Sequence, residues 1–175
     1  MPFERSADFD IGELYAALDA QRQARGMSWH QVVREINALF ARVHARPISP
    51  STLTGLRNRG TIEGDGVLQM LRWLNRTPES FVPSHPEAAA EIATLPNVGS
   101  DQILRFDTGK LYSALDAQRK ERGMSWKEVA SEIGGFSAAS LTRLSKGGRT
   151  GFPHVMRIAR WLGRPAACFT RASDW

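Results

Sequence analysis

The chain has 175 residues, with 23 lysines and arginines against 18 aspartates and glutamates and a single cysteine, Cys168. Its composition is that of an ordinary globular protein, without the bias of a disordered chain or the run of about 20 apolar residues that a membrane helix requires. The N-terminus lacks the pattern of a secretory signal, and a lone cysteine cannot form an intramolecular disulfide, so we expect a cytoplasmic protein.

Much of the sequence occurs twice. Residues 9–36 and 106–133 share 19 identities in 28 positions at a constant offset of 97. The similarity resumes between residues 48–82 and 136–170 at an offset of 88, so the first copy carries nine additional residues. A repeat of this length indicates one structural unit used twice.

The repeat predicts two domains, residues 1–82 (copy 1) and 105–175 (copy 2), joined by a linker over residues 83–104. Prolines interrupt the linker, and we expect it to let the domains orient independently. Copy 1 holds ten arginines against nine acidic residues, whereas residues 88–175 hold thirteen basic against eight acidic residues. Basic charge is therefore concentrated in copy 2, and the two copies need not do the same job.

Helix signals follow one another along copy 1. Asp10 is a candidate N-cap and Gly26 a C-terminal glycine, which predicts a first helix over about residues 11–25. Ser28 caps a second helix, which we expect to continue through Val43 and to break at Pro47. Ser49 starts a third helix over about residues 50–57, which Gly60 ends. The loop 61–64 leads to a fourth helix that holds Val67 and Leu74, and a last turn brings Phe81 to the core.

Copy 2 repeats these signals with a short connection, Gly134-Gly135-Phe136, between its second and third helices. No strand pattern is evident in either copy. We therefore expect an all-α fold. Trp29 and Trp126, at the starts of the second helices, are expected to pack on neighbouring side chains, with Trp73 and Trp161 as candidate partners.

The stretch SWKEVASEIGGFSAASLTRLSKGG, residues 125–148, resembles the DNA-binding domains of the lambda-repressor-like, or XRE, helix-turn-helix family. MSWHQVVREI and ISPSTLTGLRNRG carry the same resemblance in copy 1. The resemblance implies two tandem five-helix domains whose third helices enter the major groove of double-stranded DNA, in a transcriptional regulator that is most simply a repressor. The sequence departs from the family at Trp29 and Trp126, where a glutamine is common, and in the expanded turn of copy 1.

The resemblance also selects the candidate DNA-binding residues. Arg143 can donate two hydrogen bonds to a guanine, whereas copy 1 offers only short side chains at the base-facing positions, so copy 2 is the stronger candidate reader. The candidates in copy 2 are Ser137, Ala138, Ala139, Ser140, Thr142, Arg143, Lys146, Arg149 and Lys127. Those in copy 1 are Ser49, Pro50, Ser51, Thr52, Thr54, Arg57 and Arg59.

Several alternatives stay open. The competing function is a protein-interaction module in which domain 1 or both domains no longer bind DNA. The near-identity of the first helices is consistent with a pseudo-dimer that pairs through them, with a homodimer, or simply with the constraint of each domain's own core. We find no catalytic set, metal-ligand spacing or glycine-rich phosphate loop, so we expect neither an enzyme nor a cofactor.

Overall fold

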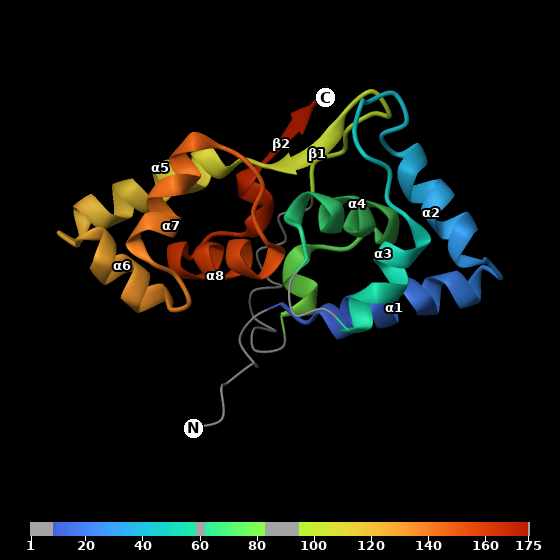
Figure 1. Ribbon diagram of the computed structural model, residues 1–175, viewed down its shortest axis with the longest axis horizontal. Coiled ribbons are helices and arrows are strands. Elements are labelled where there is room, and N and C mark those ends of the chain that lie inside the picture. Colours follow the sequence, from blue (N-terminus) through green and yellow to red (C-terminus); the bar gives the residue numbers. More distant parts are fainter. Residues whose placement is uncertain (1–8, 59–61, 83–94, 175) are drawn as a thin grey trace.

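The computed structural model describes residues 9–58, 62–82 and 95–174 (Figure 1). Within these ranges the chain is mostly helical, with eight α-helices and one small antiparallel sheet of two strands. The prediction of helices is confirmed, and the prediction that no strand would form is wrong. None of the described helices is both long and apolar enough to span a membrane.

Copy 1 folds into helices that begin where the capping residues predict. The Asp10 side chain accepts the N–H of Glu13, and Ser28 forms a reciprocal capping box with Gln31. The elements are α1 (Ile11–Ala24), α2 (Trp29–Ala38), α3 (Pro50–Thr54), the 3-10 segment η1 (Gly55–Asn58), α4 (Gly64–Leu74) and η2 (Pro78–Phe81).

Copy 2 repeats this order and adds the two strands. Gly134 and Gly135, with φ of 81° and 76°, make the tight connection between its second and third helices, a backbone conformation that favours glycine. The elements are β1 (Ile103–Phe106), α5 (Thr108–Glu121), α6 (Trp126–Ile133), α7 (Ala138–Arg143), η4 (Leu144–Lys146), α8 (Phe152–Leu162), η5 (Ala166–Phe169) and β2 (Thr170–Ser173).

The additional residues of copy 1 form a loop, because α2 ends at Ala38 and does not continue to Val43 as predicted. Phe40 and Val43 anchor the loop in the core. At its base, the Asn37 side chain donates to the carbonyl of Ile48 (2.9 Å) and accepts the N–H of Ile48 (2.8 Å). These two bonds hold the ends of the loop together, so α2 and α3 remain in contact despite the insertion.

The two copies meet around a local two-fold axis. Residues 62–64 run antiparallel to residues 150–152, with a bridge between Glu63 and Gly151, which are equivalent at the offset of 88. Two hydrogen bonds flank the bridge, from Gly64 N–H to the Thr150 carbonyl (2.9 Å) and from Phe152 N–H to the Ile62 carbonyl (2.8 Å). At the offset of 88, Gly64 corresponds to Phe152 and Ile62 corresponds to Thr150, so each bond is the counterpart of the other. This reciprocity is the pattern of an isologous contact. The contact between α4 and α8, and that between η2 and η5, also join equivalent elements.

The apolar core is continuous across this junction. Phe152 of copy 2 packs against Phe9 of copy 1, with ring centroids 4.4 Å apart, and against Phe106, at 5.4 Å. Its counterpart in copy 1 is Gly64, where an added Cβ would lie 2.7 Å from the Phe106 ring. A large residue in one copy thus complements a small one in the other. The junction also shows that the expectation of independently oriented domains is wrong. The equivalent elements that meet there are α4 with α8 and η2 with η5.

Strand β1 strengthens the junction, although it begins inside the predicted linker. It pairs in register with β2 of copy 2, from Ile103 opposite Ser173 to Phe106 opposite Thr170, and it also lies against α4 of copy 1. The α4 side chain Gln69, 1% exposed, donates to the carbonyl of Leu104 (2.6 Å). The end of the linker is therefore part of the fold.

A second α4 side chain, Asp65, binds β1 through both carboxylate oxygens. One oxygen accepts the N–H of Phe106 (2.9 Å), and the other pairs with Arg105 (3.1 Å). Further along α4, Arg72 donates to the carbonyl of Val98 (3.0 Å) in the predicted linker, and burial lowers the pKa of its guanidinium. The linker is thus fastened to copy 1 as well as to copy 2.

The close packing at Gly64 leads to a first prediction. Gly64→Ala should lower the free energy of unfolding by about 1–3 kcal/mol, because the new methyl group and the enclosed Phe106 ring cannot both keep their places. Urea denaturation measures this change. Gly66→Ala is the matched control, since its Cβ would meet no atom within 4 Å and alanine favours a helix. Equal stability of Gly64→Ala and the wild type would contradict the described packing.

Candidate nucleic-acid interface

Helix α7 presents most of the copy 2 candidates. Ser137 caps it by accepting the N–H of Ser140 (3.1 Å), and the Ser140 hydroxyl accepts the N–H of Ser137 (3.0 Å). Leu141 is fully buried and fixes the inner face of the helix. Ala138, Ser140 and Thr142 are half-buried, and Ser137, Ala139 and Arg143 are exposed. The outer face of α7 is therefore short and polar apart from one arginine.

Arg143 and Arg149 line one groove of about 290 Å³, together with Ser140, Phe136 and His154. Arg149 also reaches the other copy, since its guanidinium pairs with Glu63 at 3.3 Å. The structure thus brings Ser140, Arg143 and Arg149 together beside the local two-fold axis.

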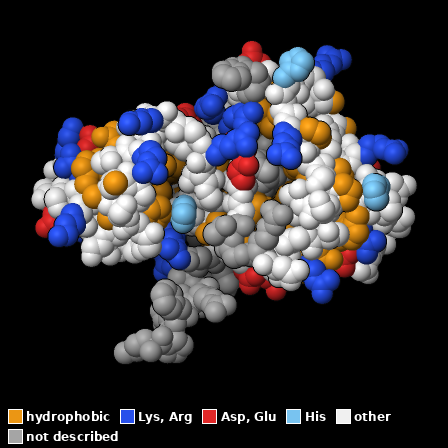
Figure 2. Space-filling model, viewed as in Figure 1, with side chains coloured by type: hydrophobic (Ala, Val, Ile, Leu, Met, Phe, Trp, Pro, Cys, Tyr) orange, Lys and Arg blue, Asp and Glu red, His pale blue; other side chains and the backbone are white. Residues whose placement is uncertain are grey.

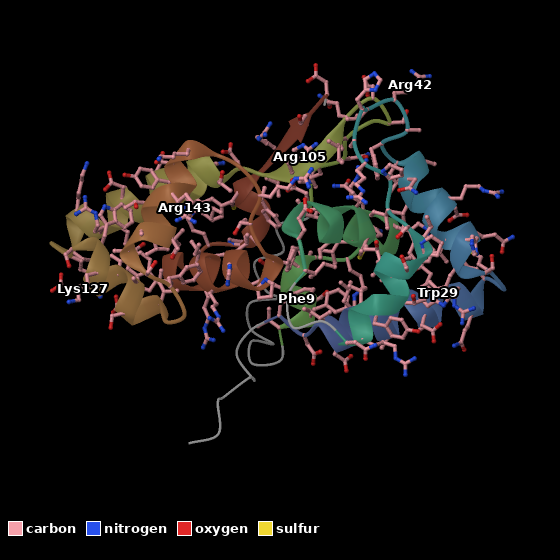
Figure 3. All side chains as sticks on the ribbon, in the orientation of Figure 1. Phe9, Trp29, Arg42, Arg105, Lys127 and Arg143 are labelled. Carbon is pink, nitrogen blue, oxygen red and sulfur yellow. The ribbon has the colours of Figure 1, made fainter. Side chains whose placement is uncertain are left out.

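The other two basic candidates of copy 2 lie outside this groove. Lys146 is exposed in η4, directly after α7. Lys127 is exposed on the first turn of α6, and Figure 3 shows it at the far end of copy 2 from the junction, well apart from Arg143. The same turn carries Glu128, whose pKa is lowered by the N–H of Ser125. Lys127 would therefore act only as a separate, peripheral contact.

In copy 1 the polar candidates of α3 bond mainly to one another. The Ser49 hydroxyl lies 2.9 Å from that of Ser51 and 3.0 Å from that of Thr52. The Thr54 hydroxyl donates to the carbonyl of Pro50 (3.2 Å). These short side chains add little reach beyond the helix surface, so copy 1 is a weaker candidate for reading bases.

Of the two arginine candidates of copy 1, Arg57 belongs to the described residues. The Arg57 guanidinium stacks over the Tyr15 ring at 5.3 Å, a cation–π contact that draws it back onto the protein surface. Arg59 lies outside the described residues.

The tryptophans at the helix starts pack on side chains, as predicted, although their partners differ from those proposed. Trp29 packs on Tyr15 and Trp126 on Tyr112, with ring centroids 5.5 and 5.3 Å apart. Both tyrosines lie on the first helix of their copy, at identical places in the repeat. The sequence signal that could have identified them is the repeated pair Tyr and Trp at a spacing of 14 residues.

Trp73 and Trp161 instead each donate a hydrogen bond to the glutamate of an Arg–Glu ion pair, one pair in each copy. Their indole N–H groups donate to Glu35 (2.8 Å) and Glu132 (2.9 Å). The pKa of each of these two carboxyl groups is lowered, first by the hydrogen bond from Arg25 or Arg122 and then by the one from the tryptophan. These half-exposed pairs are formed by residues outside α3 and α7.

The two candidate readers lie on opposite sides of the centre of the molecule, with the junction between them (Figure 1). Figure 2 shows Lys and Arg side chains gathered at the upper centre of the same face. Arg46, Arg105 and Arg149 line a common pocket at the junction. A basic region thus separates the two third helices.

Comparison with protein-family models, with curated proteins and with solved structures gave no match for this chain. Within the described part of the chain, no group of three or more His, Cys, Asp or Glu side chains could hold a metal ion.

Proposed function

We propose that the chain is a sequence-specific double-stranded DNA-binding regulator of transcription, most simply a repressor, built from two lambda-repressor-like helix-turn-helix domains. One observation carries the proposal: the two copies pair around a local two-fold axis with their third helices on opposite sides of it. DNA operators are commonly read by two such helices related by a two-fold axis. One covalent chain would then replace a homodimer.

In this proposal, copy 2 makes most of the contacts with base edges that determine sequence specificity. Helix α7 enters the major groove, where Arg143 at its end donates two hydrogen bonds to a guanine and the methyl of Ala139 touches a thymine. Lys146 and Arg149 contact phosphates, which supply most of the affinity and carry no sequence information.

Copy 1 mainly positions the chain. Its α3 offers hydroxyls that are already bonded to each other, so its half-site is read less strictly than that of copy 2. The operator is accordingly asymmetric. Because the copies are fixed to each other, binding of one half raises the effective concentration of the other and strengthens the whole complex without new contacts.

The second candidate function is a protein-interaction module, with copy 1 or both copies bound to a protein. The bonding of the α3 hydroxyls among themselves and the stacking of Arg57 on Tyr15 favour this use for copy 1. The exposed basic side chains Arg143, Lys146 and Arg149 favour DNA for copy 2.

Titration of a fluorescently labelled random-sequence duplex at two salt concentrations tests the proposal. With about six phosphate contacts, the association constant should fall about 1000-fold between 50 and 200 mM salt, because bound counterions are released on binding. Fluorescence anisotropy gives the affinity at each salt concentration. Absence of salt-dependent binding would remove the DNA proposal and leave the protein-interaction module.

A further inference from the structure

A polar pocket of about 370 Å³ lies at the junction, on the copy 1 side of the axis. The loop that only copy 1 possesses forms one wall, through residues 45–48, and the first turns of α3 and α4 form others. Strand β1 contributes Arg105, and copy 2 contributes Arg149. Four separate parts of the chain thus build one cavity.

Two polar side chains that line the pocket, Gln69 and Asp65, already have hydrogen-bond or ion-pair partners. Gln69 uses its amide N–H groups on the carbonyls of Asp65 (2.8 Å) and Leu104 (2.6 Å) and accepts a hydrogen bond from Arg72 (2.7 Å). The carboxylate of Asp65 is neutralised by Arg105 at 3.1 Å. A bound molecule would therefore meet a rigid, electrically balanced floor.

The positive charge available to a ligand comes from two other arginines. Among the described residues, Arg149 pairs with Glu63 alone, at 3.3 and 3.4 Å, and the two side chains are 64% and 44% exposed, so this pair is weak and easily exchanged. Arg46 is exposed, and among the described residues it forms no ion pair. The pocket therefore has an excess of positive charge over its two carboxylates.

Comparison of the copies shows what the insertion contributes. The groove beside α7 is the counterpart of the pocket, since Phe136, Ser140 and Gly151 occupy the places of Ile48, Thr52 and Glu63. That groove is smaller, about 290 Å³. Ala45 and Arg46 of the inserted loop add a wall and a cation to the pocket in copy 1. The groove beside α7 is also lined by two arginines, Arg143 and Arg149, so the contribution of the insertion is the additional wall and the additional cation, Arg46.

We propose that the junction pocket binds a phosphate-bearing small molecule. A guanidinium presents two parallel N–H donors that match two phosphate oxygens, and both Arg46 and Arg149 are available for this geometry. Ser49 and Thr52 lie on the same wall, but their hydroxyls are bonded to each other, so the two arginines are the donors offered to the phosphate. The volume lies in the usual range of small-molecule sites, about 300–1000 Å³.

Occupation of the pocket has a regulatory consequence, which rests on the proposed function. The pocket touches the start of α3 and the contact between the copies, so a bound phosphate would compete with the DNA backbone at the copy 1 half-site. A DNA phosphate has the same chemistry as the free ligand, and the two sources must be separated by experiment. Binding of the small molecule itself does not depend on DNA.

The test is isothermal titration of the full chain with inorganic pyrophosphate at low salt and without DNA. We expect saturable binding that Arg46→Gln weakens about tenfold or more, the effect of losing a charge-assisted hydrogen bond. Arg42→Gln is the matched control, because Arg42 belongs to the same loop but does not line the pocket and lies at its outer end in Figure 3. Its affinity should stay within about twofold of wild type.

Two results would overturn the proposal. Equal weakening in Arg46→Gln and Arg42→Gln would mean that pyrophosphate responds only to general positive charge. Absence of pyrophosphate binding, combined with weaker DNA binding by Arg46→Gln, would assign the pocket to a DNA backbone phosphate. Saturable, Arg46-dependent pyrophosphate binding by a chain that does not bind DNA would keep the pocket and remove only the proposed regulator.

Discussion

Replacing Asp65 by alanine is expected to lower the free energy of unfolding by about 2–4 kcal/mol. The Asp65 carboxylate accepts the N–H of Phe106 and pairs with Arg105, and the side chains of the pair are only 13% and 17% exposed. Its loss removes the carboxylate that pairs with a largely buried guanidinium and that accepts a backbone N–H. Because these contacts join α4 of copy 1 to β1, the change tests the junction directly. Chemical denaturation followed by circular dichroism measures it.

Asp19→Ala is the control for this prediction. Asp19 also pairs with an arginine, Arg22 at 2.7 Å, but within one turn of α1, and the two side chains are 26% and 24% exposed, more than those of the Asp65 pair. The expected loss is below about 1 kcal/mol. Comparable losses for the two variants would mean that the junction contributes no more to stability than a surface ion pair.

Replacing Arg143 by alanine is expected to weaken binding to the preferred DNA site about 10- to 100-fold. The same change should weaken binding to random duplexes much less, so the variant loses discrimination between sites. The reason is that Arg143 is the long donor on the outer face of α7, beside alanine, serine and threonine side chains. Competition titrations with specific and random duplexes measure both affinities.

Lys146→Ala is the comparison variant for Arg143→Ala. A lysine that contacts only phosphate should weaken binding to all sequences alike and reduce the slope of log affinity against log salt by about one. Equal losses on specific and random DNA for Arg143→Ala would show that Arg143 also contacts only phosphate, and specificity would then have to come from elsewhere.

The helices could be predicted from the sequence because their signals are local. Asp10, Ser28, Ser49, Ser125 and Ser137 each precede a helix and each accepts a backbone N–H at its start. The end of α2 was misjudged because the apolar residues Phe40 and Val43 continue a helical spacing, although they anchor a loop.

The junction could not be predicted, because it depends on contacts between distant residues. In the sequence Gly64 is simply the end of a predicted loop, and only its approach to Phe106 in the fold explains why a side chain is excluded. Strand β1 has four residues, too few to show an alternating pattern. One sequence signal was present: Gly64 and Phe152 differ strongly at equivalent places, as complementary partners across an axis should.

The candidate site was predicted in part. The resemblance selected Arg143 and Arg149, which the structure brings to one groove. It also selected Lys127, which lies on α6 outside this groove, and Arg57, which stacks on the Tyr15 ring. The junction pocket was missed, because Arg46, Arg105 and Arg149 come from three separate parts of the chain and no motif links them.

The most direct test of a DNA reader with two coupled halves is selection of bound duplexes from a random double-stranded pool. We expect one enriched motif with two dissimilar halves, centred one helical turn or about 34 Å apart, and the half bound by copy 2 should be the more strictly defined. Arg143→Ala should relax only that half. Failure to enrich any sequence would contradict sequence-specific recognition, and enrichment of a single isolated half would contradict the use of both copies on one operator.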